Sequence, residues 1–249
     1  MDVNMKDRTT KPLGTKAYGS IGHLPNSRMG PADHKVTDGQ ARIATVKARD
    51  KHDRVYVQEK LDGSCVAVAK IEGQLVPLGR AGYPALSSPY EMHQHFHYWA
   101  MLNFARFDEL LRDGERAVGE WLMQAHGTKY DLSGREPFVL FDIMREGHVR
   151  VLVEELKDRG KAFAMPHEIA NEPITVEAAM QALGEYGRYG AEEPVEGCVW
   201  RVERQGKVDF LCKYVRPDKV DGCCLKGEPV WNVTLNELAK AKDAPREEA

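Results

Sequence analysis

The segment Glu59-Lys60-Leu61-Asp62-Gly63-Ser64 carries residue types suited to covalent chemistry at phosphorus. A lysine amine attacks phosphorus only when unprotonated, and lowering its pKa from about 10.4 to about 7 costs roughly 4–5 kcal/mol. Partial burial and neighbouring cations can supply that free energy, so we expect Lys60 to lie inside a pocket. Gly63 permits a sharp turn beside a phosphate, and Asp62 is close enough to orient a sugar hydroxyl or a metal ion. A surface turn is the alternative interpretation of so short a motif.

Further polar and aromatic positions follow this lysine at ordered intervals, each in or beside a predicted strand. They are Arg80, Glu120, Phe141, Glu196 and Lys213. Taken singly, a surface cation, a solvated carboxylate or a core ring explains each of them. Taken in order they favour one nucleotide site, because a carboxylate can accept from ribose hydroxyls, a ring face can support a purine and a lysine can neutralise developing phosphate charge.

The series resembles the covalent nucleotidyltransferase superfamily, which comprises DNA ligases, RNA ligases and mRNA capping enzymes. It is most similar to the phage-type RNA ligases that use ATP, over residues 59–213. The resemblance implies an ATP-binding set that consists of Glu59, Lys60, Asp62, Gly63, Arg80, Glu120, Phe141, Glu196 and Lys213.

Each role in that set is implied by the resemblance. Lys60 is the catalytic nucleophile that takes AMP from ATP, and Glu59 binds the adenine edge, partly through its backbone. Arg80 approaches the nucleotide or the RNA end, and Glu120 holds the ribose hydroxyls. Phe141 stacks on adenine, Glu196 serves metal binding and catalysis, and Lys213 contacts the α-phosphate.

The implied cofactor is Mg²⁺, or Mn²⁺ in its place, because few carboxylates plus phosphate oxygens suffice to bind such an ion. The implied function joins RNA 3′-hydroxyl and 5′-phosphate ends. AMP moves from ATP to Lys60, then to the RNA 5′-phosphate, and leaves when the 3′-hydroxyl attacks. The expected partners are the ends of nicked or broken RNA, with no membrane involved.

Three features depart from the family pattern. Cys65 stands where DNA ligases usually carry arginine and related RNA ligases often carry asparagine. Leu211 replaces the first lysine of a KxK motif, for which Lys207 or Arg216 could compensate. Residues 214–249 are too few for an OB domain, so self-adenylylation is a safer expectation than complete strand sealing. Two alternatives stay open: a capping-type transferase that uses GTP, and a nucleotide- or RNA-end-binding module without turnover.

RNA contacts are expected from cations around the motif. The candidates for RNA binding are Arg28, Arg42 and Arg216. Further cations between Lys35 and Arg54 could extend a phosphate-binding face, since phosphate contacts come mostly from lysine and arginine. Acidic residues are interspersed there, so a solvated mixed surface is an equal alternative. His93, His95 and His97 are better explained as helix surface and core edge than as a metal cluster.

The pattern of elements predicts an α+β fold. The resemblance implies a nucleotidyltransferase (ATP-grasp-like) domain, with two antiparallel sheets flanked by helices and no OB domain. Predicted strands cover residues 55–60, 65–71, 74–78, 117–122, 138–143, 198–202 and 207–215. Predicted helices cover residues 88–112, with Ser88 as N-cap of a capping box, and residues 175–186. Residues 40–50 fit a short helix or a strand equally well.

The net charge, the cysteine content and the length of apolar stretches restrict which classes of protein are expected. The net charge of −3 argues against nucleic-acid binding through overall charge alone. Five cysteines without a paired framework are typical of reduced thiols in a cytosol, and no apolar stretch is long enough to span a bilayer. We therefore expect a cytoplasmic protein with a flexible arm over residues 1–16, an adenylyltransferase domain over 17–217 and a short tail over 218–249.

Overall fold

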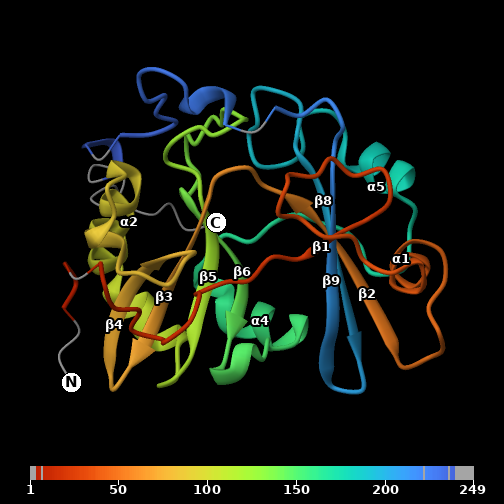
Figure 1. Cartoon of the computed structure of the whole chain (residues 1–249), viewed down its shortest axis with the longest axis horizontal. Helices are drawn as coiled ribbons and strands as arrows, with labels where there is room; N and C mark the ends of the chain where they lie inside the picture. Colours follow the sequence, from red (N-terminus) through yellow and green to blue (C-terminus); the bar gives the residue numbers. More distant parts are fainter. Residues whose placement is uncertain (1–3, 7, 221, 235, 239–249) are drawn as a thin grey trace.

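Two β-sheets stand side by side in the computed structural model, with helices around them (Figure 1). The structure describes residues 4–6, 8–220, 222–234 and 236–238. The larger sheet has the order β1-β9-β8-β2-β7, formed by Gly22–His23 (β1), Asp53–Lys60 (β2), Glu168–Ala170 (β7), Gly197–Arg204 (β8) and Lys207–Val215 (β9). The smaller sheet has the order β4-β3-β5-β6, formed by Ser64–Ile71 (β3), Gln74–Gly79 (β4), Arg116–Trp121 (β5) and Phe138–Met144 (β6).

Every predicted strand is confirmed within two residues at each end, and the predicted α+β class is confirmed with them. Neighbouring strands pair antiparallel, except that the short strand β1 runs parallel to β9. Strands β1 and β7 were not predicted, because two or three residues are too few to show alternation. The pairing of β2 with β8 places Lys60 opposite Gly197, so the end of β2 lies beside Glu196.

Short helices connect and cover the sheets. They are Asp38–Thr45 (α1), Glu91–Leu102 (α2), Phe104–Leu110 (α3), Val153–Arg159 (α4) and Val176–Leu183 (α5). Single 3₁₀ turns lie at Ala85–Ser87 (η1), Glu146–His148 (η2), Gly160–Ala162 (η3) and Cys223–Leu225 (η4). Thr37 and Gln40 form a capping box at the start of α1. Residues 40–50, which fitted a helix or a strand equally well, therefore begin in a helix. Thr175 caps α5, and Gly184 ends it with a φ of 77°.

The single helix predicted over residues 88–112 is wrong in two respects. The chain forms α2 and α3 with a break at Asn103, whose side-chain amide donates to the carbonyl of Trp99 and so competes with the backbone ladder. Ser88 is not the N-cap, because α2 begins after Tyr90 without a side-chain cap. The Ser88 hydroxyl instead accepts a hydrogen bond from the Tyr90 amide and pairs with His93 Nδ1.

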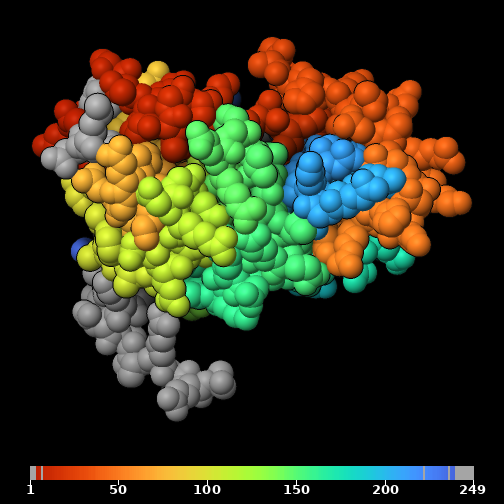
Figure 2. Space-filling model, turned by 90° about the horizontal axis from the view of Figure 1, so that it is seen from below, coloured from red at the N-terminus to blue at the C-terminus, as the bar shows by residue number. Residues whose placement is uncertain are grey.

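Two apolar layers hold the sheets in place. Under α2 and α3, the rings of Phe96, Trp99, Phe107, Trp121 and Phe138 pack together on one face of the smaller sheet. A second cluster packs the larger sheet against α1 and α5. Seen from below, the green segment around α4 lies between the yellow-green and the blue parts of the molecule (Figure 2). On the other face of the smaller sheet, a smaller apolar cluster packs Ala17 and Tyr18 of the N-terminal segment against Ala67 and Val118.

The expected arm and tail are described only in part. Residues 1–3, 7, 221, 235 and 239–249 lie outside the described residues. The blue stretch after β9 crosses the upper end of the molecule from the β9 side to the α2 side (Figure 1). Within the described part of the chain, every helix is too short or too polar to cross a membrane.

Candidate active site

A cleft of about 560 Å³ lies between the two sheets. Side chains alternate along a strand, so Gln58 and Lys60 at one end of β2, and Leu211 and Lys213 at the neighbouring end of β9, face this space. The larger sheet contributes Lys60 and Lys213 to the lining, and the smaller sheet contributes Glu120 and Phe141. Each residue of the ATP-binding set expected from the sequence lines this cleft. The separate roles of these residues stay predictions.

Lys60 and Glu196 form the central ion pair of the cleft. Lys60 Nζ lies 2.5 Å from Glu196 Oε2, and 21% of the lysine side chain is exposed against 8% of the glutamate side chain. Burial lowers the pKa of Lys60, but the carboxylates of Glu196, Glu120 and Asp62 outweigh burial and raise that pKa above its usual value. The expectation of a pKa lowered by neighbouring cations does not hold for the free protein, because carboxylates surround the amine.

Lys213 is the second cation of the cleft and comes from the neighbouring strand β9. Val199 of β8 pairs with Lys213, and Gly197 of β8 pairs with Lys60, so both lysines lie near one end of the sheet. Burial, and then the positive charge of Lys60, lower the pKa of Lys213. Its Nζ lies 3.9 Å from Asp33 Oδ1. Two lysines on one face suit a ligand with several negative charges.

The Glu120 carboxylate is hydrogen-bonded to the backbone of the segment that contains Lys60. The backbone amide of Gly63 donates a 3.0 Å hydrogen bond to Glu120 Oε1. Burial raises the pKa of Glu120 to about 7, although the attraction of Lys60 acts in the opposite direction. The carboxylate therefore points into the cleft at the base of the lysine loop, where it can accept hydrogen bonds from a ligand.

Gly63 is required by close packing against β5. A Cβ atom at this position would lie 2.5 Å from the carbonyl oxygen of Trp121. We expect Gly63→Ala to lower the free energy of unfolding by about 1–3 kcal/mol, measured by urea unfolding, because the backbone must shift. Gly39→Ala is the matched control: its nearest atom is 3.9 Å away, and alanine in helix α1 should raise stability by up to about 1 kcal/mol. Equal stability of the two variants would contradict this packing argument.

Glu59 and Asp62 line the cleft, and their side chains also bond other parts of the protein. The Glu59 carboxylate is buried on the opposite face of β2 from Lys60 and accepts a 3.1 Å hydrogen bond from the Arg188 amide. Only the backbone of Glu59 can reach the Lys60 side of the strand. Asp62 accepts from the Gly127 amide and pairs with Lys219 at 3.1 Å, which sequence reasoning did not foresee.

Arg80 and Phe141 lie on the side of the cleft nearest the N-terminal segment. The Arg80 carbonyl accepts hydrogen bonds from the amides of Ala17 and Tyr18. The Tyr18 ring meets Phe141 edge to face, with 5.3 Å between ring centroids. Burial raises the pKa of the neighbouring Cys65 thiol, so this residue adds no charge to the wall.

The two proposed substitutes for the missing KxK lysine differ in position. Leu211 lines the cleft, as the first lysine of that motif would. Lys207 pairs with Arg204 at the far end of β9, about 20 Å from Lys213 at the usual rise per residue, so Lys207 does not compensate. Arg216 lies close to the site, because its amide donates a 3.0 Å hydrogen bond to the carbonyl of Glu196.

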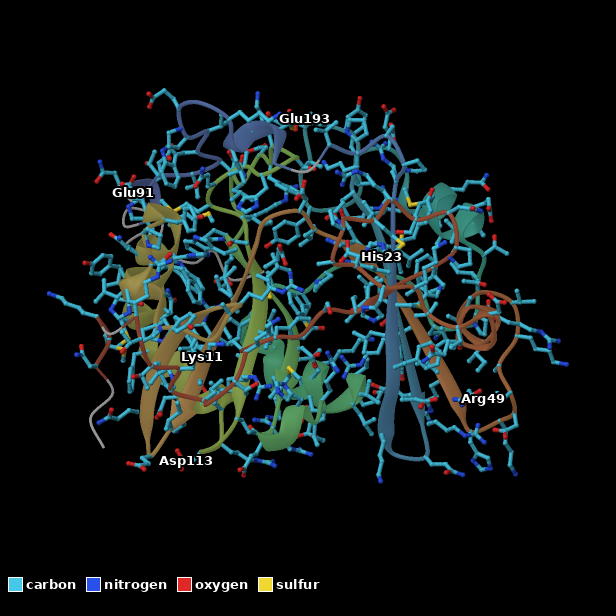
Figure 3. The ribbon with its side chains drawn as sticks, in the orientation of Figure 1. Lys11, His23, Arg49, Glu91, Asp113 and Glu193 are labelled. Carbon is cyan, nitrogen blue, oxygen red and sulfur yellow. The ribbon has the colours of Figure 1, made fainter. Side chains whose placement is uncertain are left out.

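The cations expected to contact RNA lie outside the cleft lining within the described residues. Arg49, at the outer end of the larger sheet in Figure 3, pairs with Asp53 at 2.8 Å and with Asp209 at 2.5 Å. This part of the pre-motif segment is a mixed, internally paired surface. RNA binding by Arg28, Arg42 and Arg216 stays a prediction.

His93 is a cleft residue that sequence reasoning assigned to helix surface or core edge. Its Nε2 lies 2.9 Å from Ser64 Oγ and its Nδ1 lies 2.8 Å from Ser88 Oγ. The ring thus joins the motif to the start of α2. The ordinary spacing of the three histidines gave no signal for this contact. Among the described residues, no group of three or more His, Cys, Asp or Glu side chains is arranged to hold a metal ion.

Burial of His93 makes folding stability depend on pH. Burial, with a smaller contribution from His126, lowers the pKa of His93 to about 4, so the unfolded chain binds more protons between pH 4 and 6.5. Stability is therefore lost as the pH falls through that window. The free energy of unfolding of the wild-type protein should fall between pH 7 and pH 5, as measured by urea unfolding. We expect His93→Gln to make this fall smaller by roughly 1–2 kcal/mol. Exposed His52→Gln is the control, and equal slopes in both variants would contradict the assignment.

Solved structures with matching regions include two groups of RNA ligases. An archaeal ATP-dependent RNA ligase shares 23% identity over 66% of this chain and 43% of its own, with a TM-score of 0.46. A Naegleria gruberi RNA ligase variant with ATP and Mn shares 17% identity over 81% of this chain and 61% of its own, with a TM-score of 0.47. The chain spans less than two thirds of these proteins. A search of curated proteins gave no match.

A family model describes most of the chain. The model for RNA ligases matches residues 53–215, from the start of β2 to the end of β9. The match includes the whole series from Glu59 to Lys213 and every strand of the two sheets except β1. This chain therefore belongs to the RNA ligase family.

Proposed function

We propose that this protein is an ATP-dependent RNA ligase that joins RNA 3′-hydroxyl and 5′-phosphate ends through a lysyl-AMP intermediate on Lys60. The supporting observation is the position of Lys60 Nζ in the cleft, 2.5 Å from Glu196, with Glu120 and Lys213 lining the same space. We assign this chemistry to residues 17–217 and a cytoplasmic location to the protein, whose cysteines are all free.

The first step forms a bond between Lys60 Nζ and the α-phosphorus of ATP. The ammonium group first loses a proton to solvent. The electron pair of the amine then displaces pyrophosphate as the bond between the α-phosphorus and the bridging oxygen breaks, and a second proton passes from the nitrogen to solvent. Lys213 stabilises the charge that develops on the phosphate oxygens. Glu120 accepts from the ribose hydroxyls, and Phe141 supports the purine ring.

The later steps transfer AMP and then release it. An oxygen of the RNA 5′-phosphate attacks the AMP phosphorus, the bond to Nζ breaks, and the nitrogen takes a proton from solvent, so that Lys60 regains its amine. The RNA 3′-hydroxyl oxygen then attacks the 5′-phosphorus, AMP leaves, and the hydroxyl proton passes to solvent. These transfers depend mainly on position and electrostatics, which a preorganised cleft supplies.

Glu196 fits the requirement for a divalent cation. It is a buried carboxylate that faces the cleft, and Mg²⁺ takes one or two carboxylates together with substrate phosphate oxygens. When bound, Mg²⁺ or Mn²⁺ would polarise the phosphate oxygens and offset the carboxylate charge that raises the pKa of Lys60. Glu196 meanwhile holds the lysine side chain in the cleft.

The test measures the mass of the intact protein after incubation with Mg²⁺ and each ribonucleoside triphosphate in turn. The protein is first treated with pyrophosphate, which removes any AMP already bound to the lysine. A gain of one AMP with ATP alone supports the proposal. A gain of GMP with GTP alone would favour the capping-type transferase. No adduct in folded protein would contradict the enzyme and leave the binding module, which calorimetry with ATP would then detect.

A further inference from the structure

Lys219 is a buried cation that the proposed mechanism does not use. It follows β9 by four residues, and only 4% of its side chain is exposed. Its ammonium group donates to the carbonyl of Gly127 at 2.6 Å, bonds the hydroxyl of Thr128 and lies 3.1 Å from Asp62 Oδ2. A buried lysine is costly unless it is paired and fully hydrogen-bonded, and here three acceptors meet its three protons.

The acceptor Asp62 lies only two residues after Lys60. Its Oδ2 atom accepts from the Gly127 amide at 3.0 Å and from the Thr128 hydroxyl at 3.2 Å, in addition to its pair with Lys219. The Asp62 amide donates to the Tyr130 hydroxyl at 2.9 Å. The lysine loop is thus fixed on a contiguous set of groups, and Lys219 supplies the positive charge among them.

Close packing leaves this arrangement little freedom. A Cβ atom at Gly127 would lie 2.8 Å from Asp62 Oδ2 and 2.8 Å from the carbonyl oxygen of Val220. The residues after β9 also bond the other side of the site, because the Arg216 amide donates to Glu196 and the Lys219 amide donates to Arg216. In Figure 1 this blue stretch passes over the yellow-green loop that follows β5. One short turn therefore contacts both the lysine loop and the partner of Lys60.

We infer that Lys219 is a positioning residue for adenylylation of Lys60. It fixes Asp62, and through the loop from Leu61 to Gly63 it holds the end of β2 and the Gly63 amide that binds Glu120. The inference rests on the proposed function. Lys219 lies outside the cleft lining within the described residues, so its effect on the reaction passes through Asp62.

Lys219→Met should slow formation of the AMP adduct without preventing it. A misplacement of about 1 Å in a reacting group costs of the order of 10²-fold in rate, so we expect a 10- to 100-fold lower rate constant at saturating ATP. The ATP concentration for half the maximal rate should change little, because Lys219 does not touch the nucleotide. A role in stability alone would lower the fraction of protein that reacts and leave the rate constant unchanged.

Four further variants complete the experiment, including Asp62→Asn alone as the second single variant. Lys226→Met, an exposed lysine of the same stretch, is the control and should react at the wild-type rate. Asp62→Asn combined with Lys219→Met should be no slower than the slower single variant, because both changes act through one contact. Thr128→Val removes the hydroxyl that bonds both partners and should slow the reaction several-fold, even if Lys219→Met does not fold.

Amide hydrogen exchange gives a readout that is independent of turnover. Lys219→Met should increase exchange at residues 61–64 and 127–128, and Lys226→Met should not. An unchanged rate constant, or unchanged exchange at these amides, in folded Lys219→Met or Thr128→Val would overturn the inference. If the wild-type protein forms no adduct, the proposed function is contradicted instead. In that case none of the variants would form an adduct either.

Discussion

Lys60→Met is expected to abolish the AMP adduct. The substitution keeps most of the volume and removes the only atom that can form the phosphoramide bond, and loss of a nucleophile lowers rates by about 10⁴-fold or more. The expected result is an unmodified mass after prolonged incubation with ATP and Mg²⁺. Buried Glu196 loses its partner in this variant, so the free energy of unfolding should also fall, by up to about 3–5 kcal/mol.

The control for Lys60→Met is Lys207→Met, which replaces an exposed lysine at the far end of β9. Circular dichroism at low temperature shows whether each variant is folded. Loss of the adduct can then be distinguished from loss of the folded structure. Formation of the same adduct by folded Lys60→Met would place the AMP on another residue and remove Lys60 from the mechanism. Peptide mapping of the wild-type adduct identifies the residue that carries AMP.

Glu196→Gln is expected to lower the rate constant of adduct formation by about 10²–10³-fold, the scale of a lost electrostatic contact in a preorganised site. The amide keeps the shape of the side chain and an acceptor for Lys60 Nζ, but it removes the negative charge that Mg²⁺ requires. The measurement is the rate constant across a titration of Mg²⁺. We expect the maximal rate constant to be lower. We also expect the Mg²⁺ concentration that gives half of the maximal rate constant to be higher.

Glu192→Gln is the matched control for Glu196, because Glu192 is exposed and lies four residues earlier in the same loop. It should show the wild-type rate and the wild-type Mg²⁺ dependence. If Glu196→Gln behaves in the same way, the assignment of Glu196 to metal binding is wrong. A loss of rate with no change in Mg²⁺ dependence would restrict Glu196 to orienting Lys60.

The local sequence determined the strands and the positions of the polar residues on them. Runs of β-forming residues bounded by turn residues predicted β2, β3, β5 and β9, and they placed Lys60 at a strand end, Glu120 on β5 and Lys213 on β9. The order of these residues also pointed to a common site, and they do line one cleft. Local signals suffice here, because β-forming runs and turn residues are recognisable from neighbouring positions in the sequence.

The tertiary structure decided which groups each of these side chains meets. Lys60 contacts Glu196 across 136 positions of sequence, and the carboxylates around it raise a pKa that was expected to fall. Asp62 pairs with Lys219, and His93 contacts Ser64. Burial and neighbouring charge set these properties, and both arise only when sheet register and packing bring distant segments together.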